Sequence, residues 1–460
     1  MEKIHLNKKL VYYISYLVII ALFNVISLFY LDWQIIVAAN AFLLLILFFS
    51  SFPVVGLYIF ALLYPFSGWY FISGNFNAPY HDIIGMLLLG GMVLRSIILY
   101  LEEKKHAKQI LLKIFPGFVL FALFVLASLV STVNNDSITT AIKYLLRPIS
   151  FFYLVYVLLP INIIKTKKVL LNVLKLMVAS GVFAGILGLL STIFSEGSII
   201  AHRAVPYQLF GYNLLGGNHN AIAEIMIVTI PLLIILFLKS NNYKSKGWYI
   251  VGSMFSVIVL LLTFSRTGWL ALLLQLIVLY FAFYKKNIKK TAVSFVALFV
   301  IVALFSSYFI LWNQITEVQG STSSRLMMTQ ISVSEFIKSP IVGHGLNNFN
   351  LIIGSTFAYW VEFGDALDAH GMIQKQMVES GILGLGTFCL LISYFLYNYY
   401  KQYRLSDTAA HKKVALVCLM LAIGVVFFQF FSTSYYGTRM WFPLAIGFTI
   451  LTLQQKRILN

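Results

Sequence analysis

The chain has 460 residues, of which 60% are hydrophobic and only 10% charged, and its mean hydropathy is +0.89. This composition exceeds the apolar content of ordinary globular domains and excludes a mainly soluble protein. The net charge of +18 does not indicate nucleic-acid binding, because the basic residues lie in the gaps between apolar runs instead of clustering on one soluble face. Cys389 and Cys418 both fall inside apolar segments, so neither a disulfide framework nor a thiolate metal site is indicated.

Apolar runs long enough to cross about 30 Å of hydrocarbon recur along the whole chain. They are continuous rather than alternating, which favours transmembrane helices over a barrel. The first run follows a basic N-terminus but lacks a small-residue cleavage site, so we expect a retained span. The sequence therefore predicts an all-α polytopic membrane protein with about 12–14 transmembrane helices. The expected spans lie roughly at residues 11–29, 35–50, 53–66, 83–100, 115–132, 149–163, 169–193, 218–238, 248–264, 267–284, 291–311, 380–400, 414–431 and 441–454.

The distribution of basic residues predicts the orientation. If the N-terminus is cytoplasmic, the gaps that face the cytoplasm hold most of the lysines, for example KKHAKQILLK at 104–113 and KKNIKK at 285–290. This is the bias of the positive-inside rule. We therefore expect both termini in the cytoplasm and the protein in the cytoplasmic (inner) membrane.

The basic residues expected on the outer side are mostly arginines, whereas the inner ones are nearly all lysines. A guanidinium group offers a planar fork of donors that suits bidentate phosphate binding. The outer face is therefore predicted to bind an anion. The outer residues are Lys143, Arg147, Arg203, Arg266, Arg325, Lys338, Lys375 and Arg439.

Arg266 is the sharpest local feature, because it stands between two apolar runs in LLLTFSRTGWLALLLQ at 260–275. A charge there is costly unless it faces a polar cavity or an anion. The alternative is an arginine that snorkels at a helix end, but topology does not require a cation on the outer side. We prefer the functional interpretation.

A second polar cluster spans 201–224, where AHRAVPYQLFGYNLLGGNHNAIAE precedes a span. Its glycines allow close approach of the backbone to a ligand, and its Asn and His side chains supply uncharged donors. The alternative is a polar loop that caps a helix, and for His202, His219 and Glu224 taken singly we favour it over catalysis. Arg203 fits either interpretation.

A third cluster lies at 362–386 and contains His370 and Glu379. Histidine titrates near neutral pH and can take a proton from a hydroxyl, although a lone loop histidine is more often simply solvated. Glu362, Asp365, Asp368 and His370 match no metal-binding spacing. We therefore predict no metal and no cofactor.

The long outer gap at 312–372 is where loop-borne function should concentrate. The polar stretch STSS at 321–324 leads into RLMMTQISVSEFIKSP, whose apolar residues favour one side before Pro340 stops the helix. We expect an amphipathic helix along the outer membrane interface.

Four segments together resemble the bacterial O-antigen ligase and O-antigen polymerase superfamily. That family shows an Arg after a small residue at the outer end of a span, a P-x-x-G-x-G-x-x-x-F stretch in a large external loop, and an HN-x-x-x-x-x-x-x-E-x-G-x-x-G stretch entering the next span. The chain departs from it at Gly371, where the family has Asn. The segments are RAVPYQLFGYNLLGGNHNAIA at 203–223, SRTGWLAL at 265–272, SSRLMMTQISVSEFIKSPIVGHGLNNF at 323–349 and AHGMIQKQMVESGILGLG at 369–386.

The resemblance covers about 200–390, so we expect N-terminal transmembrane helices at 1–200 and a ligase/polymerase-like region at 201–460. It implies a GT-C-like, inverting, metal-independent glycosyltransferase that uses an undecaprenyl-diphosphate-linked glycan on the outer face. It also implies roles for individual residues. These are Arg203, Arg266 and Arg325 for the diphosphate, His370 and Glu379 for catalysis, and Asn218, His219 and Arg439 as further substrate-binding residues.

Polymerase and ligase share this chemistry and differ in acceptor. The Lys-, Ile- and Asn-rich composition suits a low-GC organism, a group that includes organisms without lipid A, and this favours polymerisation of surface polysaccharide units over ligation to lipid A core. A lipid-linked oligosaccharide flippase is the alternative from another class, but transporters place their charges at the bilayer midplane rather than at outer helix ends. Expected partners are the undecaprenyl-diphosphate-linked oligosaccharide, membrane lipids, a flippase and a chain-length regulator, with no nucleic acid.

Overall fold

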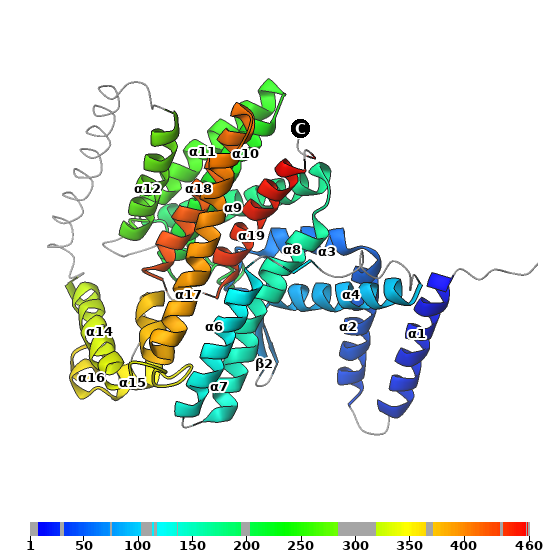
Figure 1. Cartoon of the computed structure of the whole chain (residues 1–460), viewed down its shortest axis with the longest axis horizontal. Coiled ribbons are helices and arrows are strands. Elements are labelled where there is room, and N and C mark those ends of the chain that lie inside the picture. The colour runs from blue at the N-terminus through cyan, green and yellow to red at the C-terminus, as the bar shows by residue number, and fades with distance from the viewer. Residues whose placement is uncertain are drawn as a thin grey trace, which may run out of the picture.

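The computed structural model describes residues 8–27, 32–73, 76–102, 113–114, 117–135, 137–194, 203–283, 319–364, 371–432, 436–456 and 458. These residues are almost entirely helical, with one two-stranded hairpin, as Figure 1 shows. The all-α fold class is thereby confirmed. The expected span at 291–311, His202, Asp365, Asp368 and His370 lie outside the described residues.

Seven helices in the described part of the chain are long and apolar enough to cross a membrane, which makes the protein multi-pass. They are α2 (Trp33–Ser51), α4 (Tyr80–Glu102), α9 (Lys167–Phe194), α10 (His219–Lys239), α11 (Tyr243–Leu262), α17 (Met372–Leu405) and α18 (Ala409–Gln429). Shorter apolar stretches occur in α1 (Lys8–Ser27), α3 (Pro53–Leu63), α6 (Phe118–Ser131), α8 (Leu159–Ile163) with the segment before it, and α12 (Arg266–Phe283). The last helix is α19 (Thr438–Gln455).

Helix α10 forms the centre of the bundle. In the most apolar 18-residue stretch of α10, 83% of the residues are buried, whereas the corresponding share is only 17% in α2 and in α11. A helix that is apolar on all sides is stable only when other helices or lipid surround it. Helices α9, α11 and α18 pack around α10. The residues that face lipid are therefore expected on the less buried helices, such as α2 and α11.

The expected span at 149–163 has an unusual backbone. After α7 (Ile138–Tyr144), the chain forms two π-helical segments, η2 (Leu145–Ile149) and η3 (Phe152–Leu158), before α8. Phe152 of η3 stacks on Trp441 of α19, with ring centroids 4.3 Å apart and planes 13° apart. Hydropathy predicted the apolar segment but not these wider turns, which are rare and often occur at functional sites.

The long loop at 312–372 contains the expected helix, α14 (Gln319–Lys338), followed by α15 (Phe349–Ser355) and α16 (Phe357–Phe363). One side of α14 packs into a small core of Met328, Phe349, Ile353, Tyr359 and Val378. Figure 1 shows α14, α15 and α16 gathered beside one end of α17. Leu326, Val333 and Ile337 remain exposed on α14, and its location at the membrane interface stays a prediction.

A β-hairpin that was not anticipated occupies the gap before α4. Strands β1 (Tyr70–Ser73) and β2 (Phe76–Pro79) are antiparallel, with Tyr70 opposite Pro79 and Ser73 opposite Phe76. The hairpin leads directly into the first residue of α4, so it fixes where that helix begins.

Candidate functional site

The predicted diphosphate-binding arginines come together from three separate parts of the chain. Arg266 acts electrostatically on both Arg203 and Arg325, and these two in turn act on the His219 ring. Groups that are partly buried interact in this way only when they are near neighbours. Residues of the loop before α10, the starts of α10 and α12 and the helix α14 are thus coupled through their charges, and we call them the arginine cluster (Arg203, Arg266, Arg325 and His219).

Arg203 is held by the turn between α11 and α12. Its Nε donates to the Thr263 carbonyl at 2.8 Å and its Nη2 to the Phe264 carbonyl at 3.4 Å. Carbonyls at the end of a helix lack partners within the helix, so this arginine also caps α11. Burial, and next the charge of Arg266, lower the pKa of Arg203 to about 10. The guanidinium group therefore still carries its charge at neutral pH.

Arg325 contributes a buried donor. Its side chain is half-buried, and its Nε has no hydrogen-bond partner among the described residues. Burial, followed by the charge of Arg266, lowers the pKa of Arg325. Buried polar groups almost always have a partner, so an unsatisfied guanidinium nitrogen beside other cations indicates a place for an anionic ligand.

Two helix N-termini meet at the arginine cluster. Asn218 caps α10 by accepting a bond from Asn220 N at 2.9 Å, and Ser265 caps α12 by accepting one from Gly268 N at 3.2 Å. Ser265 Oγ also donates to Asn220 Oδ1 at 2.7 Å, which ties the two helix starts together. A helix N-terminus carries partial positive charge and favours anions, so the backbone adds to the three guanidinium groups.

Gly268 stands two residues after Arg266 in the motif SRTG. A Cβ at position 268 would lie 3.0 Å from Ala223 Cβ on α10 and 2.9 Å from Leu260 Cδ1. Glycine therefore permits the close approach of α12 to α10. The motif holds the two helix starts together as well as supplying the charge.

Glu379 lies deep in α17 and is fully buried. Its carboxylate forms an ion pair with Lys375 one turn earlier, at 4.0 Å. Its carbonyl accepts a hydrogen bond from Gly345 N at 3.0 Å and another from Ser131 Oγ. Glu379 is thus fixed from several sides, and its catalytic role stays a prediction.

The segment 340–346, which we call the strap, lies against α17 where that helix kinks. Gly381 has φ 59° and ψ −157°, and Ile382 N donates to the Pro340 carbonyl at 2.8 Å. Gly343 has φ 72°, and a Cβ there would lie 2.6 Å from the Glu379 backbone. The glycines of the P-x-x-G-x-G stretch therefore permit backbone contact, which a side chain would prevent.

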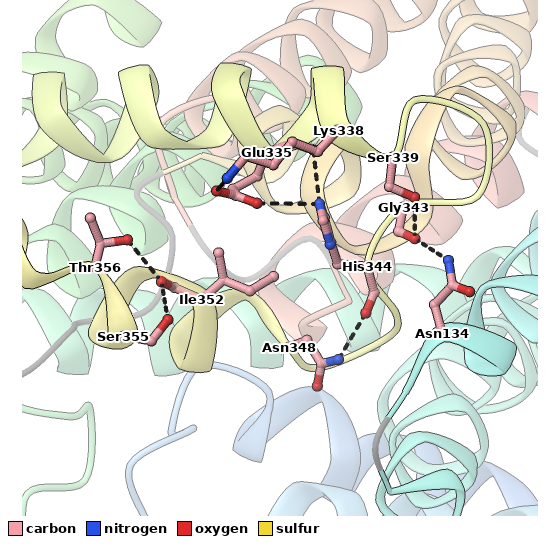
Figure 2. Close-up of polar contacts among 10 residues, drawn as sticks. All are labelled: Asn134, Glu335, Lys338, Ser339, Gly343, His344, Asn348, Ile352, Ser355 and Thr356. Carbon is pink, nitrogen blue, oxygen red and sulfur yellow. Dashed lines mark hydrogen bonds and ion pairs between the residues drawn. The ribbon is translucent and has the colours of Figure 1, made fainter.

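The strap also connects α14 to the rest of the protein, as Figure 2 shows. His344 Nε2 bonds to the Glu335 carbonyl at 2.8 Å and lies 3.4 Å from Glu335 Oε2. Asn134 Nδ2 donates to the Gly343 carbonyl at 2.7 Å, which joins the strap to the short 3-10 turn η1 (Thr132–Asn134) that follows α6. These contacts position the helix that carries Arg325. Sequence reasoning missed His344 and Glu335, although a histidine between two motif glycines was a visible clue.

Arg439 is a buried tie between distant segments. Its Nη1 pairs with Glu224 Oε2 at 3.2 Å, and its Nη2 donates to the Leu215 carbonyl at 2.9 Å and to Ser67 Oγ. These contacts join α19 to α10, to the loop before α10 and to the segment before the hairpin. Its predicted part in substrate binding remains untested.

The catalytic histidine and metal dependence also stay predictions. His370 lies outside the described residues, two positions before the first residue of α17. Over the parts of the chain that the structure describes, there is no group of three His, Cys, Asp or Glu side chains that could hold a metal ion.

Residues 251–389 match a family described as O-Antigen ligase. No curated protein matches the chain. The matched region contains Arg266, Arg325, the strap and Glu379, and it supports a glycosyl-transferring enzyme of surface polysaccharide biosynthesis. Arg203, His219 and Arg439 lie outside it. Residues 251–389 of the chain are thus similar to the O-antigen ligase family.

Proposed function

We propose that the protein transfers a glycan from a polyprenyl diphosphate carrier, undecaprenyl diphosphate, to a hydroxyl of an acceptor glycan on the outer face of the bacterial cytoplasmic membrane. The observation that carries the proposal is the arginine cluster. The charge of Arg266, at the start of α12, acts on both Arg203 and Arg325, and the Arg325 Nε is buried without a hydrogen-bond partner among the described residues.

The chemistry needs little more than this site provides. A diphosphate is already a good leaving group, so it requires no general acid. It requires cations placed where negative charge grows as the glycosidic bond breaks, and removal of one such donor typically costs about 3 kcal/mol, or a hundredfold or more in rate. Arginine suits this role because its fork can bind phosphate oxygens in pairs.

For the acceptor side we propose His370 as the base that takes the proton from the attacking hydroxyl. It lies shortly before α17, whose first turns hold the Lys375–Glu379 pair. His219 and Asn218, at the start of α10, are proposed to contact the donor next to the arginines. A single displacement of this kind inverts the anomeric centre, and it needs no metal because arginines serve the diphosphate.

We favour polymerisation of repeat units of an O-antigen, capsule or exopolysaccharide over ligation to a surface acceptor, on the composition of the chain. A flippase is the weaker alternative, because the arginine cluster lies at helix ends rather than at the middle of spans. The positions of basic residues support cytoplasmic termini, with Lys239 at the opposite end of α10 from the cluster. A flippase and a chain-length regulator are the proposed protein partners.

The test is deletion of the gene followed by analysis of the lipid-linked glycans. A polymerase leaves single repeat units on the carrier, a ligase leaves finished polymer on the carrier, and a flippase leaves units at the cytoplasmic leaflet. Complementation with Arg266→Ala should reproduce the deletion phenotype at a normal protein level, whereas Arg404→Ala, an exposed arginine at the other end of α17, should restore polymer. Normal polymer from the Arg266 variant would remove the arginine cluster from the reaction.

A further inference from the structure

A second polar cavity lies apart from the arginine cluster. Its volume is about 530 Å³, within the range of roughly 300–1,000 Å³ that holds small-molecule ligands. It is bounded by the β-hairpin, the start of α4, α7, η3 and the start of α19. None of Arg203, His219, Arg266 and Arg325 lines it. The cavity is therefore separate from the arginine cluster.

One wall of the cavity is a hydrogen-bonded set built on the first turn of α4. His81 Nε2 lies 2.9 Å from Thr438 Oγ1 and 3.1 Å from Asp82 Oδ1, and the Tyr156 hydroxyl donates to the same carboxylate oxygen at 2.5 Å. His81 is only 3% exposed, and its Nδ1 has no hydrogen-bond partner among the described residues. A buried, unpartnered ring nitrogen in a cavity wall marks a position that a ligand can satisfy.

The other walls are largely aromatic. Tyr70, Tyr144, Phe151 and Tyr436 line the cavity together with Tyr156. Aromatic rings offer apolar faces to the C–H faces of sugar rings, while a carboxylate and an imidazole bind sugar hydroxyls. The charges of the lining are mixed, because Lys143 and Arg439 lie there together with Asp82, and Arg439 is already paired with Glu224. The cavity is therefore not a purely cationic anion site. The lining therefore fits a saccharide.

The backbone of this wall is the π-helical part of the chain. Phe151 and Tyr156 belong to the stretch that contains η3, and Tyr144 immediately precedes η2. Wider helical turns of this kind are rare and are frequently found at functional sites. This observation is independent of the lining chemistry and points to the same cavity.

The cavity also adjoins the start of α17. The Lys375 ammonium lies 5.6 Å from the centre of the Tyr144 ring, and Lys375 pairs with Glu379. Tyr144 thus separates the cavity from the helix that follows the segment of His370. A saccharide bound in the cavity would lie beside the first turns of α17.

We propose that this cavity binds sugar rings of the acceptor glycan, with Asp82 and His81 as the hydroxyl-binding groups and Tyr70 as a stacking surface. The assignment of the saccharide as acceptor rests on the proposed function. Saccharide binding itself follows from the cavity alone, so the two can be tested separately.

The experiment measures binding of a soluble oligosaccharide to the purified full chain in nanodiscs by titration calorimetry. The probe is the repeat-unit oligosaccharide released by mild acid from the lipid-linked glycans of the bacterium that carries the gene. Asp82→Asn should raise the Kd of the oligosaccharide by roughly tenfold, because a hydrogen bond to a charged group is lost. Asp407→Asn, which alters an aspartate outside this cavity, is the matched control and should leave the Kd unchanged.

Tyr70→Ala is the second variant, because Tyr70 is 44% exposed and its loss should not disturb folding. It should also weaken oligosaccharide binding, while inhibition of transfer by inorganic pyrophosphate stays at the wild-type level. An unchanged Kd in both variants, or no binding to the wild-type protein, would overturn the saccharide site. If oligosaccharide binding depends on Asp82 but Arg266→Ala still makes polymer, the cavity stands and the proposed donor site fails.

Discussion

Arg266 stands at a helix start and acts on two further arginines. It is the first residue of α12, where the helix dipole is positive, and it acts on the guanidinium groups of Arg203 and Arg325. Electrostatic repulsion among neighbouring arginines lowers stability, and proteins retain such a cost where activity depends on it. The sequence predicted these three arginines from their type and side of the membrane, but their convergence depends on how α10, α12 and α14 pack.

Replacement of Arg325 by Leu should therefore separate ligand binding from stability. The variant removes a half-buried cation, so its Tm without ligand should equal or exceed that of the wild-type protein. Pyrophosphate at about 100 times its Kd should stabilise the wild-type protein by about 2.7 kcal/mol, and this gain should vanish in the variant. Thermal unfolding with and without pyrophosphate measures both quantities, and an undiminished gain would contradict anion binding by Arg325.

Arg439 should behave in the opposite way, because its bonds are internal. Arg439→Met leaves the buried Glu224 carboxylate without its cation, at a cost of about 3–5 kcal/mol. The double variant with Glu224→Gln removes the unpaired charge and should recover most of that loss. Unfolding of the single and double variants checks this. A single variant of normal stability but without activity would instead place Arg439 in substrate binding.

Among the elements, the helices were the most predictable, because a span must be apolar over its whole length. The helix in the outer loop was expected to start near 321–324 and end before Pro340, and α14 covers Gln319–Lys338. The hairpin was missed, although Gly74 and Asn75 separate two stretches of the kind that form strands. The π-helical turns and the kink at Gly381 arise from packing between distant segments, which periodicity does not report.

The strap gives a prediction at this scale. Gly343→Ala should lower stability by more than about 2 kcal/mol, because alanine at positive φ alone costs roughly 1–2 kcal/mol and its Cβ would meet the Glu379 backbone. Transfer activity should fall as well, since the strap positions α14. Gly386→Ala is the matched control on α17, where nothing lies within 4 Å of the new Cβ, and it should be neutral or stabilising. Equal stability of the two variants would contradict the role assigned to the strap.

At the scale of the whole molecule, hydropathy predicted the class but not the relation between the two parts of the chain. The division at residue 200 stays an expectation. Gly68, from the first part, donates its N–H to the Leu214 carbonyl, and a Cβ there would lie 2.1 Å from Gly216 N. Arg439 joins the same two regions from the C-terminal helix. The resemblance covered only about 200–390, so contacts made by the first 200 residues were invisible to it.

Orientation in the membrane can be tested with exposed residues. Phe357 on α16 is 76% exposed and should lie outside the cell, whereas Tyr243 at the start of α11 is 88% exposed and should lie inside. A cysteine at 357 should react with an impermeant maleimide in intact cells, and a cysteine at 243 only after permeabilisation. The reverse pattern would invert the topology.

The bond between Ser265 and Asn220 has a kinetic consequence. Because this bond holds the starts of α10 and α12 together, the proposed phosphate-binding site forms during folding and not when the donor binds. The carrier lipid keeps both phosphates after its glycan has been transferred, so the same site should continue to bind it. We expect departure of the used lipid to limit steady-state turnover, with a faster first cycle in rapid-quench measurements. A uniform rate from the first cycle onward would show that the site releases the carrier diphosphate quickly once the glycan has been transferred.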